Sequence, residues 1–316
     1  MAVLLGAIAV LALLVQSAQN HFGVLQPQQA LEAGPAAYPR YATDQDGRKV
    51  TLPNPTQRVA SQYWSIDETL YSVLPPGHIV GVSRYAYNPA TSNVLRFAEA
   101  YHPVVTADAE SVLAVAPDLL LVSSSARADL TDLLRNAGVP TFRMFTDYRT
   151  LDQIAENITL TGYLTGHDAV AGQARDEFKR AIQRAAARKP AGAASPRVLG
   201  YSGKYSYGER TSFSDVLRVL GAVNVAAEHG LQGYDAINTE QILRWNPEWL
   251  ISRADPGETE ATLRRLISDP AIAATIAAQK KQILVLENRV FLPMSPFTAN
   301  LLDILAEAFY GRSAKS

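Results

Sequence analysis

Two segments of the chain share one residue pattern, and this internal repeat constrains the fold more than any other feature. Glu110 begins ESVLAVAPDLLLV and Glu240 begins EQILRWNPEWLIS, with a proline seven residues after each glutamate. An acidic residue and a hydrophobic run follow each proline. Because proline ends a helix and an unbroken hydrophobic run is typical of a buried parallel strand, each copy predicts a short helix followed by a strand. We therefore expect two lobes that are built alike, with Asp108 and Thr239 as the helix caps.

Hydrophobic runs alternate with helical patterns in the first half of the chain. The runs are RVASQY, HIVGVS, DLLLVS and TFRMF, and the helical patterns cover residues 66–74, 110–115 and 128–136. A turn at Asp46 and Gly47 precedes them and predicts a hairpin of two short strands. Strands that alternate with helices at this spacing predict right-handed crossovers and a mostly parallel sheet.

The middle of the chain, residues 150–188, is helical in its periodicity. Gly162, Gly166 and Asp168 indicate a break and a new cap before a second helix. That helix would have about 20 residues and a length of about 30 Å, enough to bridge two lobes. Alternation resumes after the linker KPAGAASP with RVLGYS, EWLISR, QILVLE and VFLPM, and a closing helix is expected over residues 298–310.

The first residues predict export. Residues 2–15 form an unbroken apolar run, which is shorter than the ~17 to 25 residues of a membrane-spanning helix. Val15 and Ser17 stand at the spacing that signal peptidase accepts, although no Lys or Arg precedes Arg40. A buried N-terminal helix is the alternative, which the polar stretch at 16–37 disfavours. The expected segments are a signal peptide (1–18), an N-terminal leader (19–40), an N-terminal α/β lobe (41–147), a helical segment with the interdomain helix and linker (148–195) and a C-terminal α/β lobe (196–312).

Composition excludes several classes of protein. The 316 residues include no cysteine, which excludes disulfides, thiolate metal sites, a thiol nucleophile and a lipid anchor on cysteine. With 29 basic and 30 acidic side chains the net charge is -1. This charge supplies no field to attract nucleic acid or an anionic membrane. We therefore expect a soluble, exported protein that does not insert into a membrane after processing.

Several of these segments together resemble the periplasmic substrate-binding proteins of iron-complex and cobalamin ABC importers. They are RVAS, ETL, VGVSRYAYNP, ESVLAVAPDLLLVS and EQILRWNPEWLI, and the similarity spans residues 41–311. It implies an α/β fold of two doubly wound lobes joined by a single long rigid α-helix, the class III periplasmic binding protein fold. It also implies that the transmembrane subunits of an ABC importer are partners. Members of the family dock on arginines of those subunits through one exposed glutamate on each lobe, at the motif positions of Glu110 and Glu240.

Aromatic residues follow the predicted strands, where doubly wound lobes bind their ligands. Flat rings stack on conjugated or macrocyclic chelates, and arginines pair with anionic groups. Arg127 is one candidate for such a pair. For Tyr63, Tyr201 and Phe213, packing beneath the loops and contact with a ligand are equally consistent with the sequence. The residues expected to bind the ligand are Trp64, Arg84, Tyr85, Tyr87, Tyr205, Tyr207, Tyr234 and Arg253.

The expected function is to capture a metal chelate in the periplasm and deliver it to an ABC importer. A ferric siderophore or similar iron complex is the favoured ligand, with cobalamin and heme as alternatives. A receptor that senses the ligand instead of transporting it is a further alternative. We expect a monomer with no resident cofactor. We expect no metal bound directly to the protein, because the five histidines lie far apart in the sequence.

An enzyme on the same scaffold is the alternative of another class, and the sequence disfavours it. Gly200 and Ser202 begin a pattern like the nucleophile elbow GxSxG, but Lys204 stands where the last glycine is required. No Walker loop or dinucleotide-binding motif follows a predicted strand. ATP hydrolysis would therefore take place in the importer.

Overall fold

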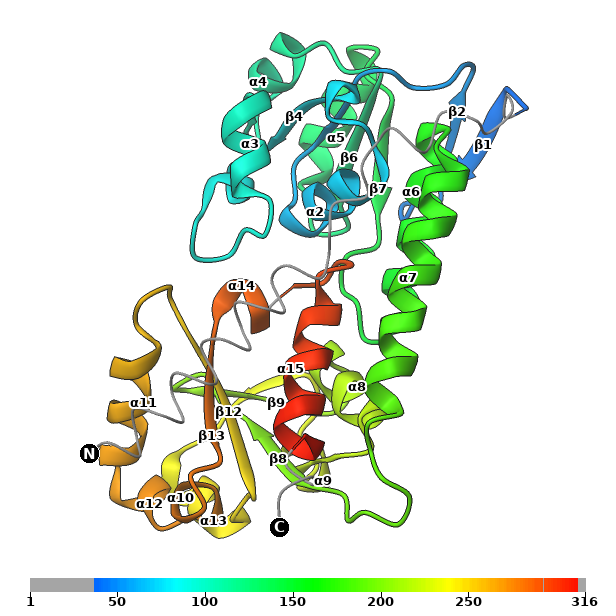
Figure 1. Cartoon of the computed structure of the whole chain (residues 1–316). Coiled ribbons are helices and arrows are strands. Elements are labelled where there is room, and N and C mark those ends of the chain that lie inside the picture. The colour runs from blue at the N-terminus through cyan, green and yellow to red at the C-terminus, as the bar shows by residue number, and fades with distance from the viewer. Residues whose placement is uncertain (1–36, 292, 312–316) are drawn as a thin grey trace.

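The computed structural model describes residues 37–291 and 293–311. The predicted signal peptide and nearly all of the predicted leader lie outside these ranges. Within them, no helix is both long and apolar enough to cross a membrane. Figure 1 shows two lobes, with helix α7 (Asp168–Ala186) running from one to the other on one side of the molecule.

The N-terminal lobe is built on a five-stranded parallel sheet with the order β5-β4-β3-β6-β7. Strands β3 and β6 are buried along their whole length, as their unbroken apolar runs require. The predicted hairpin forms beside the sheet from two antiparallel strands. The strands are β1 (Arg40–Thr43), β2 (Lys49–Leu52), β3 (Val59–Ser61), β4 (Ile79–Ser83), β5 (Val104–Val105), β6 (Leu119–Ser123) and β7 (Thr141–Met144), and the helices are α2 (Trp64–Val73), η2 (Pro76–His78), η3 (Arg84–Tyr87), α3 (Leu95–Tyr101), α4 (Ala109–Ala114) and α5 (Ala128–Asn136).

The C-terminal lobe repeats this plan with a four-stranded parallel sheet, β10-β8-β12-β13, and it also has a separate two-stranded antiparallel sheet, β11-β9. Its strands are β8 (Arg197–Gly200), β9 (Tyr205–Tyr207), β10 (Val223–Asn224), β11 (Tyr234–Ala236), β12 (Trp249–Ala254) and β13 (Ile283–Glu287). Its helices are α8 (Ser212–Val219), α9 (Val225–Glu228), α10 (Thr239–Trp245), α11 (Thr259–Ser268), α12 (Pro270–Ala273), α13 (Ile276–Gln279), α14 (Asn288–Phe291) and α15 (Thr298–Tyr310).

Two details of the prediction were wrong. The run VFLPM was expected to be a strand, but its first residues, Val290 and Phe291, end the short helix α14 and are buried. A short apolar run does not by itself distinguish a strand from a buried helical turn. The cap of α10 is Asn238, whose side chain accepts a hydrogen bond from the amide of Gln241, and Thr239 is the first helical residue. Asp108 caps α4 as predicted.

The crossover between the lobes consists of two antiparallel helices, and the expected single connecting helix is not confirmed. Helix α6 (Leu151–Thr165) begins against the C-terminal lobe, where the amide of Leu151 donates to Asp215 at 2.8 Å. Helix α7 begins against the N-terminal lobe, where Arg40 pairs with Asp168 at 2.7 Å. The chain reverses at Gly166, which has a left-handed φ of 77°. The predicted break was therefore placed correctly, but Asp168 is the first residue of α7 and not its cap, and both helices span the gap.

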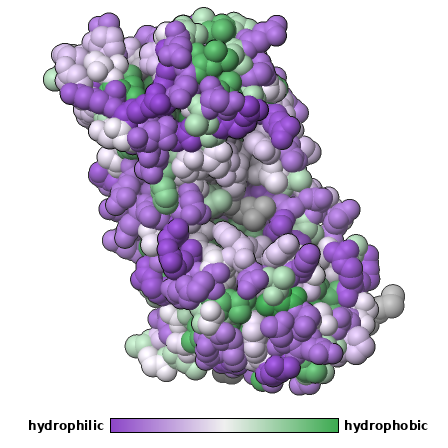
Figure 2. All heavy atoms as spheres, turned by 180° about the vertical axis from the view of Figure 1, so that it is seen from behind, coloured by the Kyte–Doolittle hydropathy of each residue, from purple (hydrophilic) through white to green (hydrophobic). Residues whose placement is uncertain are grey.

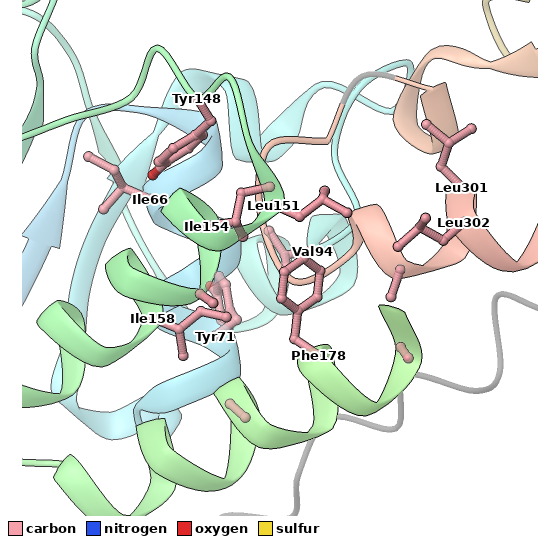
Figure 3. Packing of buried hydrophobic residues seen from close by; sticks show 14 of the residues in the cluster. Ile66, Tyr71, Val94, Tyr148, Leu151, Ile154, Ile158, Phe178, Leu301 and Leu302 are labelled. Atoms are coloured by element: carbon pink, nitrogen blue, oxygen red, sulfur yellow. The ribbon is translucent and has the colours of Figure 1, made fainter. Parts of the chain in front are cut away.

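A continuous hydrophobic core joins the two lobes through these helices. Figure 3 shows Tyr71 and Ile66 of α2, Ile158 of α6, Phe178 of α7 and Leu302 of α15 in one packed cluster. Gly162 allows the helices α6 and α7 to approach closely. A Cβ atom added to it would lie only 2.2 Å from the Cβ of Ala171. Because close-packed protein interiors transmit strain instead of absorbing it, we expect the lobes to move little relative to one another.

Candidate functional site

Hydrogen bonds across the molecule show that the carboxyl ends of the two sheets face each other. Asn93, in the loop after β4 and η3, donates through Nδ2 to the carbonyl oxygen of Arg289 at 2.9 Å, and Arg289 follows β13. Ser295, between α14 and α15, donates to the carboxylate of Glu68 on α2. In parallel α/β sheets ligands bind at this end of the strands. The region between the lobes is therefore the candidate binding site.

Two adjacent carboxyl groups, Asp67 and Glu68, are buried behind this region. Asp67 accepts hydrogen bonds from Ser61 and Ser83, whereas Glu68 accepts them from Asn93 and Ser295. Burial raises the pKa of Asp67 and of Glu68 to about 7, and the hydrogen bonds offset only part of that increase. The one sequence signal for this pair is its position as a charged dipeptide inside the uncharged remainder of the helix WSIDETLYSV.

A cluster of aromatic residues around Tyr207 forms the C-terminal side of the site. Tyr207 is buried, and its ring lies 5.5 Å from that of Tyr234 and 5.1 Å from that of Phe291. Arg253, half-buried at the end of β12, donates through Nε to the hydroxyl of Tyr207 at 3.2 Å and through Nη1 to Asn288 at 2.6 Å. Across the described ranges, Arg253 has no carboxylate oxygen within ion-pair distance.

Tyr234 lies where the two lobes approach each other. Its side chain is 56% exposed, yet enough protein surrounds it at longer range to perturb its ionisation. Burial raises the pKa of Tyr234, and the nearby phenol of Tyr207, the carboxylate of Asp147 and the phenol of Tyr63 raise it further. Asp147 and Tyr63 belong to the N-terminal lobe, so Tyr234 lies near groups from both lobes.

The N-terminal side of the site carries Trp64, Arg84 and Tyr85. Trp64 is half-buried at the start of α2, with its ring 6.0 Å from that of Tyr63. Arg84 and Tyr85 are exposed at the end of β4, and the guanidinium of Arg84 lies 5.2 Å from the ring centroid of Tyr85. Arg84 forms no ion pair within residues 37–291 and 293–311. These side chains are available to a ligand.

Other residues that were expected at the ligand are used differently by the fold. The hydroxyl of Tyr87 donates to carbonyl oxygens of Ala98 and His102, so it is occupied within the N-terminal lobe. Tyr207 was expected in a flexible loop, but it is buried and packs against Tyr234 and Phe291. Tyr201 and Phe213 are also buried, which corresponds to the packing alternative for both. Tyr205 remains exposed on β9, and Arg127 pairs with Asp129 on the surface.

The two repeated glutamates are exposed, each in the first turn of its helix. Neither Glu110 nor Glu240 forms an ion pair in the described part of the chain. A surface hollow of about 410 Å³ lies near the other end of α4, lined by Arg58, Pro76 and Val115 among others. It lies at the amino ends of the strands, so it is separate from the candidate site. No group of three or more potential metal ligands occurs among the described residues.

Comparison with known proteins agrees with this architecture. The family model for periplasmic binding proteins matches residues 59–290. The heme binding protein HmuT superposes with a TM-score of 0.70 at 23% identity, over 92% of this chain and 96% of that one. The periplasmic heme-binding protein RhuT from Roseiflexus sp. RS-1 gives 0.68 at 22% identity, over 81% and 98%. A periplasmic heme binding protein from Pseudomonas aeruginosa gives 0.68 at 24% identity, over 82% and 94%. No curated protein matches the sequence.

The two sheets, their helices and the matched segment define a periplasmic binding protein. The chain belongs to this family, in the group of iron-complex and cobalamin binders, which confirms the resemblance found in the sequence. Members of the family are binding proteins and not enzymes, and they work with the membrane components of ABC importers. At identities below 25%, the likeness to the solved structures establishes the fold alone.

Proposed function

We propose that this periplasmic binding protein captures an iron chelate between its lobes, and that heme is a better candidate than a ferric siderophore. The observation that carries the proposal is that Tyr207 contacts both Tyr234 and Arg253 on the C-terminal side of the site. Its ring packs against the ring of Tyr234, and its hydroxyl accepts a hydrogen bond from Arg253. Three proteins of similar fold are named as heme-binding proteins, which supports the same choice. Cobalamin and ferric siderophores become the competing ligands in the test below.

The chemistry of heme matches the groups that these residues offer. A tyrosine phenolate is a known axial ligand of ferric heme, and Tyr234 places a phenol between the lobes. Heme carries two propionates, and Arg253 is a half-buried guanidinium without a carboxylate partner among the described residues. On the opposite side, Trp64 and Tyr85 offer ring faces for a flat macrocycle. Arg84 contributes at the margin of the site.

A titration of purified protein with hemin, cobalamin and a ferric catecholate siderophore tests the proposal. We expect hemin to bind with a dissociation constant below about 10 μM, seen as a shift of its Soret band. Tyr234→Phe removes only the hydroxyl and should shift the band and weaken binding at least tenfold. Tyr205→Phe is the matched control, because Tyr205 is also exposed, at 46%, but lies outside the Tyr207 cluster. Tight binding of cobalamin or the siderophore with no hemin binding would reject heme as the ligand.

For delivery, we propose that Glu110 and Glu240 dock on arginines of the importer's transmembrane subunits. Both carboxylates are exposed and free of ion pairs in the described residues, so a partner can pair with them without breaking an internal contact. Replacing both by alanine should abolish uptake while leaving the affinity for the chelate unchanged. If chelate affinity falls instead, the glutamates belong to the binding site and the docking role is wrong.

A further inference from the structure

The helices that carry the two glutamates share more than the glutamates. In α4, Val112 is fully buried and Leu113 is 46% exposed; in α10, Ile242 is fully buried and Leu243 is 41% exposed. Each leucine stands three residues after its glutamate, and side chains at this spacing lie on the same face of a helix. Each lobe therefore presents one carboxylate and one exposed leucine side by side.

Exposed leucines are uncommon elsewhere in the described residues. Leu133, on α5, is the other leucine with comparable exposure. A single exposed apolar residue needs no explanation. Two exposed leucines at matched positions of the two lobes do call for an explanation. The residues around them differ between the lobes, yet the exposed glutamate, the buried aliphatic residue and the exposed leucine occur in both. Seen from behind, hydrophobic residues reach the surface in the upper and in the lower part of the molecule, among hydrophilic ones (Figure 2).

Contacts between corresponding residues anchor both helices, a feature we call the arginine clasp of each lobe. Arg58 donates to the carbonyl oxygens of Ala116 at 2.8 Å and Val115 at 2.7 Å, and its own amide donates to Asp118 at 3.0 Å. In the C-terminal lobe, Arg197 and Glu248 occupy the places of Arg58 and Asp118. The clasps attach each glutamate–leucine pair to the start of its sheet, so the lobes fix the separation of the two pairs.

We infer that Leu113 and Leu243 form the apolar half of a duplicated docking surface, whose occupant is the pair of membrane-spanning subunits of an ABC importer, one subunit on each lobe. The inference rests on the proposed delivery function and extends it. Two similar surfaces on one chain suit a partner that presents the same surface twice. The unpaired carboxylates require a cationic group on each subunit, and the leucines require an apolar notch beside it. Figure 1 shows α4 and α10 in different lobes, both to the left of α7.

The test measures docking of the protein to its importer in lipid nanodiscs, with hemin binding measured separately. Leu113→Ser and Leu243→Ser should each weaken docking about tenfold, and the double variant about a hundredfold, because each buries about half a leucine side chain. Leu133→Ser and Ile267→Ser are matched controls, one on each lobe, and should dock normally. High salt should diminish the defect of Glu110→Ala but leave the leucine defects unchanged.

Several outcomes separate this inference from the proposed ligand. Normal docking by the leucine double variant would overturn it. If the wild type forms a dimer in sedimentation experiments that the leucine variants lose, the occupant is a second copy of the chain and the inference is wrong. If the leucine variants dock poorly and the wild type binds no hemin, the docking surface is supported and heme is rejected as the ligand. Absence of docking by the wild type would reject the surface and the delivery function together.

Discussion

At the scale of single residues, the site depends on side chains whose neighbours come from distant parts of the sequence. Tyr234 and Tyr207 are paired residues of one two-stranded antiparallel sheet, yet Tyr234 is exposed between the lobes and Tyr207 is buried. Burial raises the pKa of Tyr234, with Tyr207, Asp147 and Tyr63 adding to the effect, so its phenol is protonated in the free protein at neutral pH. A ferric ion must displace this proton in order to bind the phenolate.

This displacement predicts that hemin binding depends on pH. The affinity of the wild type should rise with pH, by up to about tenfold per pH unit, because binding releases one proton from Tyr234. The affinity of Tyr234→Phe should show a smaller dependence, since its ring has no proton to lose. Soret titrations between pH 6 and pH 9 measure both slopes. Equal slopes in the two proteins would mean that Tyr234 is not the iron ligand.

The buried carboxyl groups predict a second pH effect, this time on stability. The folded-state pKa of about 7 for Asp67 and Glu68 exceeds the unfolded value of about 4, so the folded protein binds more protons between these pH values. With respect to these groups, stability is therefore greatest below about pH 4 and is lost as the pH rises towards 7, by roughly 4 kcal/mol per group. Urea unfolding of Glu68→Gln should show a flatter pH profile, whereas the exposed control Glu99→Gln should follow the wild type.

At the scale of secondary-structure elements, the internal repeat extends from residue pattern to hydrogen bonding. The residue before each repeated proline has a left-handed backbone, with φ of 43° at Ala116 and 46° at Asn246. The arginine clasp of each lobe satisfies carbonyl groups at the end of its helix, which would otherwise lack partners. The repeat was visible in the sequence from the glutamates and prolines, but the role of Arg58 and Arg197 was not, because they lie 52 and 43 residues before those glutamates.

Loss of the clasp should destabilise the lobe to which it belongs. Arg58→Ala removes two hydrogen bonds to carbonyl groups on an exposed surface, and we expect a loss of about 1 kcal/mol in the free energy of unfolding. Arg197→Ala should have a similar effect in the other lobe. Urea unfolding followed by circular dichroism measures both. Arg96→Ala, an exposed arginine on α3, is the control and should unfold like the wild type.

At the scale of the whole molecule, the lobes are held together by packing and not by a single connector. The core cluster that includes Ile66, Phe178 and Leu302 contains residues of both lobes and of the two crossover helices. The bonds of Glu68 and Asn93 to the segment around α14 add polar contacts across the same junction. The two lobes are therefore expected to unfold together and to change their separation little when a ligand binds.

Truncation of the shared core tests this cooperativity. Phe178 is fully buried on α7, so Phe178→Ala should reduce the free energy of unfolding by about 3 to 5 kcal/mol. Because the core is shared, fluorescence of Trp64 in one lobe and of Trp245 in the other should report a single transition, shifted equally. Single-tryptophan versions of the protein separate the two signals. Two distinct transitions would show that the lobes fold independently.

The sequence by itself determined the local structure and the family of this protein. Periodicity predicted the strand–helix alternation, the break at Gly166 and the closing helix α15, because these features depend on neighbouring residues. Tertiary structure alone decided the antiparallel pair of crossover helices, the use of the Tyr87 hydroxyl within its own lobe and the burial of Glu68 at the junction. Their environments are set by segments far away in the chain, and local pattern carries no information about which distant segment will cover a given side chain.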